Sequence, residues 1–337
     1  MSLDDPLAIA FINQFQGGFP VTEEPYAWVA SRLGTDESAL IASITKLLDE
    51  GWLSRFGPLY DAKQMGGGLT LAALAVPDER FEEVTDIVNS YQQVAHNYRR
   101  DYALNMWFVL ATETEQAVLE VIDDIQQRSG LKVYNCPKIQ EFFVGLQLSL
   151  KPDGTVDTVP LNSAWNGSGA IDNTPLVLDE FEREIIAATQ TGLALIPRPY
   201  QQIAKQLDSN SARVMRCMQS MLKNGAMRRI GAVPNHYKLG LLGNGMTVWD
   251  VPDELVGEMG KIMGSMDFVS HCYERPRHRP DWPYNLFAMI HGTDREQVMQ
   301  KLSIMEAELY PYNFQHRVLF STAVLKKTGL RLTKQTE

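Results

Sequence analysis

One segment of this chain concentrates side chains that can hold anions, bind a metal or transfer a proton. It reads HCYERPRHRPDWPYN and runs from His271 to Asn285. Arginine keeps its charge and its planar guanidinium binds carboxylates through two hydrogen bonds. Histidine can ligate a metal or move a proton near neutral pH. The combination predicts a site for a flat, polycarboxylated ligand, with or without an iron ion.

The candidate roles within this segment follow from residue type. On a strand, His271, Tyr273 and Arg275 would share one face, because side chains alternate with a period of two. Three prolines after Arg275 exclude a regular helix and indicate a structured loop between two strands. The remaining candidates are Arg277, His278 and Arg279, and Asn285 as a hydrogen-bond donor. The alternative is a surface hairpin whose charges are merely solvated.

The segment belongs to the second of two copies of one sequence pattern. His96-x-Tyr98 recurs 175 residues later as His271-x-Tyr273, and Gly51, Arg55 and Gly57 have matching positions 174 residues later. The first copy reads HNYRRDYALNMW from His96. It keeps His96, Arg99 and Arg100, and Asn105 matches Asn285, but the second histidine and the prolines are missing. His96 is therefore either a core residue or part of a site.

A second basic cluster lies upstream of the loop. Arg228, Arg229 and His236 form the fuller version of Arg55 and Lys63 in the first copy. These residues would hold ligand carboxylates from the opposite side of a cleft, or else remain solvated charges. His291 and His316 have apolar neighbours in strand patterns and are predicted to be structural.

The elements around these residues follow the same order in both copies. Three helical patterns open each copy, over 5–15, 24–33 and 36–50, and over 178–190, 199–207 and 210–224. Thr35 and Ser209 are the expected N-caps, and Gly51 and Gly225 the expected stops. The strands after these glycines predict the wing of a winged helix-turn-helix. A βαββαβ pattern follows, which is typical of a ferredoxin-like sandwich.

We therefore expect an α+β protein that is a tandem duplication. The predicted units are a winged helix-turn-helix at 1–62, a ferredoxin-like domain at 63–150, a linker at 151–176, a second winged helix-turn-helix at 177–238 and a second ferredoxin-like domain at 239–330. This architecture resembles the Lrp/AsnC regulators, and both copies in one chain would form an intramolecular pseudo-dimer. A further homo-oligomer stays open.

Composition and charge narrow the function classes. The 337 residues carry a formal net charge of −10, whereas nucleic-acid binders usually present a basic face. The pattern at 36–50 is acidic, and the two copies are not equivalent reading heads, so DNA binding is disfavoured. The N-terminus lacks the basic start of a signal peptide, no uncharged run is long enough for a membrane span, and the three cysteines are scattered. We therefore expect neither a signal peptide nor a membrane anchor, and a cytoplasmic protein.

The HCYERP, PDWPYNLF and RRIGAV motifs, with HNY in the first copy, resemble those of the siroheme decarboxylases. The chain is similar to the fused two-subunit form of haem d1 biosynthesis in denitrification. The resemblance implies conversion of siroheme to 12,18-didecarboxysiroheme by loss of two acetate carboxyl groups as CO2. It implies no cofactor beyond the iron-isobacteriochlorin of the substrate itself. The alternatives are an Lrp/AsnC-type transcription regulator and a haem-binding sensor without turnover.

The resemblance also suggests roles for particular residues. His271 would be the ligand of the substrate iron or the acid, with His96 or His278 as its partner. The substrate carboxylates would lie on arginines, and Tyr273 and Asn285 would donate hydrogen bonds. The family often has a second histidine where this chain has Tyr102, which favours one active site per chain.

Overall fold

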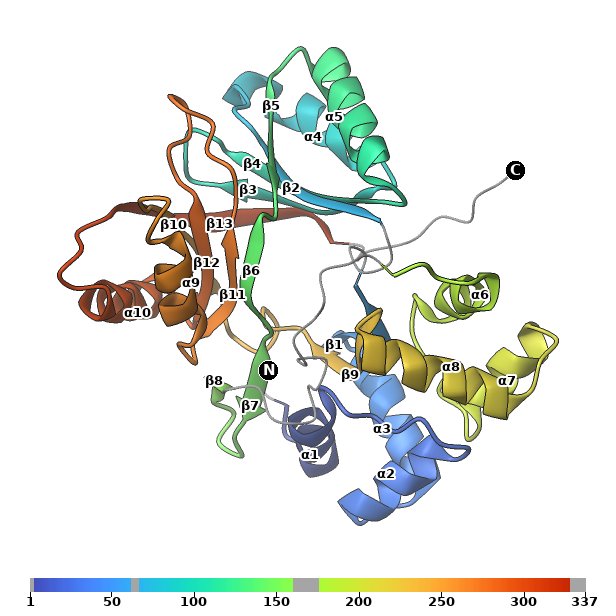
Figure 1. The fold of residues 1–337 in the computed structure, drawn as a ribbon. Helices are drawn as coiled ribbons and strands as arrows, with labels where there is room; N and C mark the ends of the chain where they lie inside the picture. Colours follow the sequence, from blue (N-terminus) through green and yellow to red (C-terminus); the bar gives the residue numbers. More distant parts are fainter. Residues whose placement is uncertain (1–2, 62–66, 160–175, 328–337) are drawn as a thin grey trace.

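The computed structural model describes residues 3–61, 67–159 and 176–327 of the chain. Two regions are evident, one helical and one built on β-sheet, and each takes elements from both copies (Figure 1). The predicted Lrp/AsnC-like α+β duplication is confirmed in this arrangement.

The copies contain equivalent elements in the same order. The first has α1 (Pro6–Phe15), α2 (Pro25–Leu33), α3 (Glu37–Asp49), β1 (Leu53–Tyr60), β2 (Gly68–Leu74), α4 (Phe81–Ser90), β3 (Val94–Arg100), β4 (Met106–Thr112), α5 (Glu115–Ser129), β5 (Val133–Pro137) and β6 (Gln140–Val144). The second has α6 (Glu180–Thr189), α7 (Pro199–Gln206), α8 (Ser211–Asn224), β9 (Met227–Pro234), β10 (Gly243–Asp250), α9 (Val256–Gly264), β11 (Val269–Glu274), β12 (Leu286–Gly292), α10 (Arg295–Glu308) and β13 (Gln315–Lys327).

The third helix of each copy begins one residue later than the sequence predicts. The Asp36 carboxylate accepts the N–H of Ala39 at 2.8 Å, and the Asn210 side chain accepts the N–H of Arg213 at 2.9 Å. The prediction of Thr35 and Ser209 as caps is therefore wrong. A cap has to reach an N–H three residues ahead, and the side chains at 36 and 210 do so. Helix α3 is followed by Gly51 and α8 by Gly225, both with left-handed backbone, as predicted.

The wing strands differ from the expectation that each copy builds its own wing. Among the described residues, β1 of the first copy pairs with β9 of the second in an antiparallel two-stranded sheet, with Gly57 opposite Gly231. The helices of both copies then share one hydrophobic core, which includes Phe11, Phe56 and Met218. The two helical units are thus joined into one body.

The second units of the two copies form one continuous nine-stranded sheet, with five strands from the first copy and four from the second. Its order is β5-β2-β4-β3-β13-β10-β12-β11-β6, so each half has the 4-1-3-2 order of a ferredoxin-like fold. The halves join because β13 is long: residues 315–320 pair with β10, and residues 321–327 pair with β3. In return, β6 of the first copy pairs with β11 of the second.

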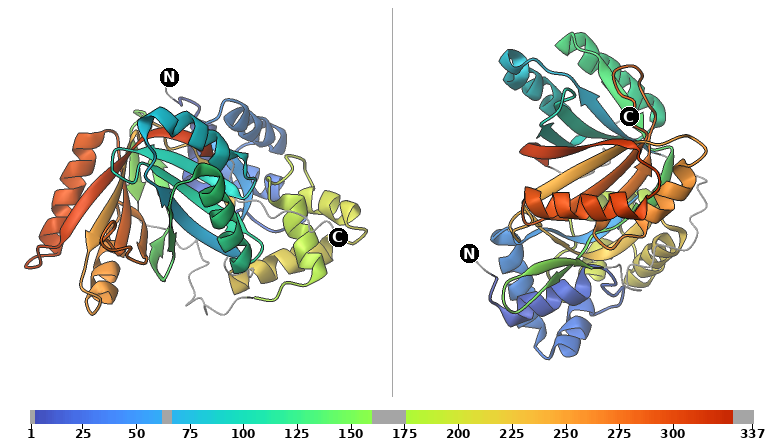
Figure 2. Two further views of the ribbon diagram at one scale, coloured as in Figure 1. Left: turned by 90° about the horizontal axis from the view of Figure 1, so that it is seen from above. Right: turned by 90° about the vertical axis from the view of Figure 1, so that its left-hand side faces the viewer.

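Each half of the sheet has one face covered by helices. Helices α4 and α5 cover the first half and α9 and α10 the second, on the outer sides of the molecule (Figure 2). The helix-free faces meet in a separate core that includes Trp107, Trp282 and Phe287. Side chains alternate along each strand, so every second residue of β3 and β11 must point to this helix-free side.

A hairpin connects the two copies. Strands β7 (Gln147–Leu150) and β8 (Val156–Val159) pair with each other. The side chain of Gln16, directly after α1, binds both the N–H and the C=O of Leu148. The segment predicted as a linker, 151–176, therefore contains strand β8, and its residues 160–175 lie outside the described part of the chain. No helix among the described residues is long and apolar enough to cross a membrane.

Candidate active site

The two strands β3 and β11 carry the same pattern, His-x-Tyr-x-Arg, on the helix-free face. His271 lies opposite Met289 and Tyr273 opposite Phe287, and both of these partners belong to the core between the sheet halves. On β3, Tyr98 lies opposite Trp107 of the same core. The predicted shared face of His271, Tyr273 and Arg275 is confirmed, and β3 repeats it.

The two triads, His96-Tyr98-Arg100 and His271-Tyr273-Arg275, also match in their contacts. The ring centroids of histidine and tyrosine lie 6.2 Å apart in the first triad and 5.9 Å apart in the second. Each arginine lies over the ring of its tyrosine, at 5.8 Å for Arg100 and 4.9 Å for Arg275. The Nε atoms of both arginines are buried without a hydrogen-bond partner, so each retains an unused donor.

The second triad is surrounded by ionic groups from three other elements. Arg228 of β9 forms ion pairs with Asp61 at 2.5 Å and with Glu141 of β6 at 3.4 Å. Lys138 also pairs with Glu141, and its amine lies 5.6 Å from the centre of the Tyr273 ring. Cations therefore outnumber carboxylates in this cluster once Arg275 is counted. A polycarboxylate would be attracted here despite the acidic total of the chain.

The segment after β9 covers the helix-free face from the helical region. The His236 ring lies 5.3 Å from that of His291 and 4.3 Å from that of Tyr237. The amine of Lys327, at the end of β13, lies 5.3 Å from the centre of the Tyr237 ring. Lys327 acts electrostatically on both His96 and His236, and His236 in turn interacts with His271. His236 thus links the surroundings of the two triads.

Burial keeps the histidines of this face neutral. It lowers the pKa of His271 to about 4, with Arg228 adding to the shift, and lowers the pKa of His96 to about 4 with Lys327 adding to it. The pKa of His236 falls to about 3 for the same reason. Burial also raises the pKa of Tyr98 to about 12. Neutral imidazoles offer lone pairs to a metal, which a protonated ring cannot do.

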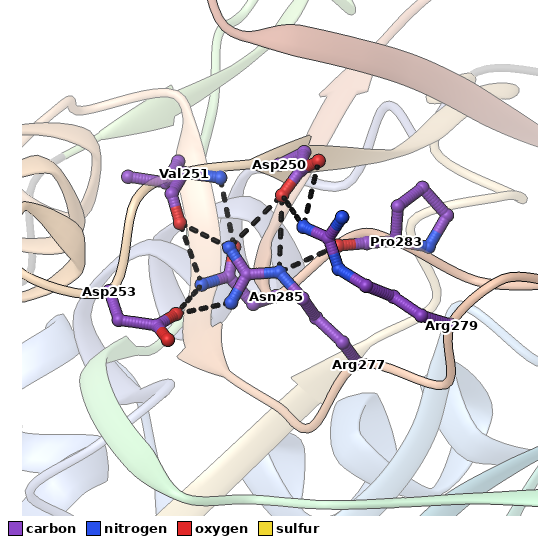
Figure 3. Close-up of polar contacts among 7 residues, drawn as sticks. All are labelled: Asp250, Val251, Asp253, Arg277, Arg279, Pro283 and Asn285. Carbon is purple, nitrogen blue, oxygen red and sulfur yellow. Dashed lines mark hydrogen bonds and ion pairs between the residues drawn. The ribbon is translucent and has the colours of Figure 1, made fainter.

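Other residues of the loop after β11 are engaged within the protein. Arg277 donates to Asp250 and Asp253 and to the backbone oxygens of Val251 and Pro283, as Figure 3 shows. Arg279 lies against Asp250 as well, at 3.2 Å. These arginines hold the loop to the end of β10, so we leave them out of the substrate-binding set.

The Asn285 side chain is also bound within the protein, to the backbone of Val251. Its amide accepts the N–H of Val251 and donates to the oxygen of Val251, both at 3.0 Å, and Asn105 makes the same pair of bonds with Val76. The predicted match between Asn105 and Asn285 is confirmed, and both side chains anchor a strand end.

Three further candidates point away from the triads. His278 bonds through Nε2 to the Asn135 oxygen at 2.8 Å and packs edge-on against Tyr134. Arg99 pairs with Asp78 and lies over Phe81 on the helix-covered side. Arg229 is buried beside Arg55 and donates to Ala232, while Arg228 on the other face of β9 reaches the second triad. Strand alternation separates Arg228 from Arg229.

Sequence reasoning did not identify several residues that the fold brings to this face. Lys138, Glu141 and Lys327 lie far from the triads in sequence and have no motif of their own. Tyr98 was visible as part of the repeated pattern but had no assigned role. The described residues contain no group of three His, Cys, Asp or Glu side chains arranged to hold a metal ion. Each triad contains one histidine that could bind the iron of a ligand.

Both halves of the chain are similar in sequence to known proteins. Residues 9–53 and 182–228 match the model of the siroheme decarboxylase NirDL-like HTH domain, and residues 65–142 and 238–326 match the AsnC-like ligand binding domain. A siroheme decarboxylase of Hydrogenobacter thermophilus is 30% identical over 94% of this chain and 92% of its own length.

Two solved structures are similar to this chain over nearly its whole length. The crystal structure of the siroheme decarboxylase NirDL has a TM-score of 0.71 and 27% identity, and the alignment covers 98% of this chain and 94% of that one. A structure of NirDL in complex with an iron-uroporphyrin III analogue gives a TM-score of 0.69 and 28% identity over 96% and 92%. With both halves matched in sequence and in fold, the chain belongs to the siroheme decarboxylase family.

Proposed function

We propose that this chain converts siroheme to 12,18-didecarboxysiroheme in haem d1 biosynthesis, removing two acetate carboxyl groups as CO2. The observation that carries the proposal is the pair of His-Tyr-Arg triads on one helix-free face, with Arg228, Lys138 and Lys327 as further cations. Membership of the family and the iron-uroporphyrin III analogue bound to NirDL support the same substrate class.

The cations would hold the ring carboxylates in place. Arg100 and Arg275 each keep an unused Nε donor beside a tyrosine ring, which suits a carboxylate at the edge of a flat macrocycle. Arg228 would exchange part of its pairing with Glu141 and Asp61 for a substrate carboxylate. The neighbouring tyrosines would pack against the ring and donate hydrogen bonds.

The reaction at each acetate arm breaks the bond between the carboxyl carbon and the methylene. The electron pair stays on the methylene carbon and is delocalised into the electron-poor ring, and CO2 leaves. A proton then adds to that carbon and gives a methyl group, so each step consumes one proton and needs no oxidant. The protein has to hold the arm, exclude water and supply the proton.

The histidines of the two triads are the candidates for binding the substrate iron or donating a proton to the substrate. His271 has two roles open to it, as ligand of the substrate iron through Nε2 or as proton donor, and His96 would act as its partner. We infer that no organic cofactor is needed, because the macrocycle of the substrate accepts the electron pair.

Anaerobic incubation with siroheme followed by mass spectrometry tests the proposal. The expected products have lost one and then two CO2, in the order of time. A spectral shift on binding with no loss of mass would identify a haem-binding sensor instead. No spectral shift, together with retention of a labelled DNA duplex, would identify a regulator of the Lrp/AsnC type.

A further inference from the structure

A chain of hydrogen bonds runs from His271 through Ser270 to His291 and Asn244, on the same helix-free side of the sheet. The His271 Nδ1 atom lies 2.9 Å from the Ser270 hydroxyl, which lies 2.7 Å from Nε2 of His291. The Nδ1 atom of His291 lies 2.6 Å from the side-chain oxygen of Asn244. Ser270, His291 and Asn244 are all buried, so no bulk water competes for these contacts.

Which atom donates in each hydrogen bond can be worked out from the Asn244 end of the chain. The Asn244 amide nitrogen lies 3.3 Å from the oxygen of Leu241 and 3.4 Å from that of Leu242, so its oxygen faces His291 and can only accept. His291 therefore carries its proton on Nδ1. The Nε2 atom of a neutral His291 is then an acceptor, and the Ser270 hydroxyl must donate to it.

The last bond fixes the tautomer of His271. The only hydrogen of the Ser270 hydroxyl is already directed to His291, so its oxygen accepts from His271. His271 thus carries its proton on Nδ1, and its Nε2 atom has a free lone pair. Burial beside His236 and His271 supports a neutral His291, whose pKa lies well below its usual value.

The first copy lacks this chain at every position. Asn244 and His291 are cross-strand partners, and the equivalent pair in the first copy is Leu69 and Ala111. The residue before His96 is Ala95, where the second copy has Ser270. In keeping with this difference, the Nδ1 atom of His96 is buried with no hydrogen-bond partner among the described residues.

We propose that Ser270, His291 and Asn244 are positioning residues that hold His271 as the tautomer with a free Nε2, which makes His271 the ligand of the substrate iron and not the proton donor. This inference rests on the proposed function. A neutral imidazole with its only proton directed to Ser270 has none to give at Nε2, whereas its lone pair is what iron requires. The proton for the substrate carbon then comes from another group. The two halves differ in this respect, because only the second has the supporting chain.

The tautomer can be tested without substrate. The full chain labelled with ¹⁵N at its six histidines is assigned by comparison with His271→Ala, and long-range ¹H–¹⁵N correlation reports which ring nitrogen carries the proton. We expect Nδ1–H for His271 in the wild type and a shift toward Nε2–H in Ser270→Ala, which copies Ala95. Ser270→Thr keeps the hydroxyl and should restore Nδ1–H. A wild-type His271 protonated on Nε2 would overturn the proposal.

The effect on the iron can be tested with ferrous siroheme. Loss of the hydrogen bond in Ser270→Ala or His291→Ala should weaken the donor, move the iron–histidine stretching band to lower wavenumber and reduce siroheme affinity about 10- to 100-fold. Ser270→Thr and the exposed control Ser265→Ala should keep the wild-type band. An unchanged band in both Ser270→Ala and His291→Ala refutes the positioning role. If instead the band is the same in wild type and His271→Ala, the ligand role in the proposed function fails, while the tautomer measurement still decides the hydrogen-bond chain.

Discussion

Arg275 of the second half donates from Nη1 to the backbone oxygen of Cys136 in the first half, over 2.5 Å. The relationship is reciprocal, because Arg100 of the first half donates to Leu319 of the second half at 2.7 Å. Each arginine of the two triads is therefore fixed by the opposite half of the chain. The site depends on both copies even where only one copy supplies the residue.

Replacement of Arg275 should affect substrate binding more than stability. Lysine cannot both reach the Cys136 oxygen and offer a planar pair of donors to a carboxylate. We expect Arg275→Lys to raise the KM for siroheme about 10- to 100-fold, the equivalent of about 1.5–3 kcal/mol for a charged hydrogen bond. Steady-state kinetics with siroheme measures this change.

Arg277→Lys is the matched control for Arg275→Lys. Arg277 binds Asp250, Asp253 and two backbone oxygens, so its loss should lower the free energy of unfolding by about 2–3 kcal/mol and leave the KM unchanged. The reverse pattern, with KM raised at 277 and unaltered at 275, would show that the loop arginines bind substrate.

Replacement of His271 by alanine should reduce turnover, whereas replacement of His278 should affect only stability. His271→Ala removes the proposed iron ligand and should reduce turnover by at least about 100-fold, the upper end of the loss caused by removing a group that only supports a metal ligand. His278→Ala loses one bond to Asn135 and should cost about 1 kcal/mol of stability with turnover retained. Product formation is followed by mass spectrometry under anaerobic conditions. Equal loss of turnover in the two variants would contradict the placement of His278 outside the site.

Stability should fall as the pH is lowered from about 6.5 toward 4. His96, His236 and His271 have pKa values of about 4, 3 and 4 in the folded chain, below the ordinary value of 6.5. The unfolded chain binds more protons in this window, so protonation favours unfolding, by at most about 1.4 kcal/mol per pH unit for each histidine. Urea unfolding at pH 7, 6 and 5 measures the slope.

The variant His236→Gln checks the source of this pH dependence. It removes one of the titrating groups and should make the slope smaller between pH 6.5 and 4. A slope that is the same in wild type and variant would show that His236 is already protonated or solvated in the folded chain.

The close approach of the end of α1 to β9 should be sensitive to a single methyl group. A Cβ atom at Gly231 would lie 2.4 Å from the backbone oxygen of Gln16, which follows α1, and 2.5 Å from that of Phe15, the last residue of α1. Backbone atoms cannot move aside cheaply, so Gly231→Ala should destabilise the fold by about 1–3 kcal/mol or more. Gly257→Ala is the control, because nothing lies within 4 Å in α9 and alanine favours a helix by up to about 1 kcal/mol. Urea denaturation compares the two, and equal stability would argue against the close approach of α1 to β9.

The sequence alone was sufficient for most helices and strands and for one half of the site. Periods of 3.6 and 2 in the apolar residues place the helices and strands, because each element has to bury one face. The same period puts His271, Tyr273 and Arg275 on one side of β11. The repeat at 174–175 residues predicts two equivalent units, which the fold confirms.

The tertiary structure decided which residues meet. The exchange of β6 and β13 between sheet halves, the pairing of β1 with β9, and the approach of Lys138 and Glu141 to His271 depend on contacts between distant segments, which leave no local period to read. From residue type alone, Arg275 and Arg277 are equally good candidates for binding a carboxylate. Their contacts in the fold distinguish them, because Arg275 lies over Tyr273 whereas Arg277 pairs with Asp250 and anchors the loop. Similarly, Ser270 and His291 have ordinary strand positions in the sequence. Their hydrogen bond to one another exists because the ladder between β11 and β12 shifts its register at Ser270, and because both side chains are buried beside Asn244.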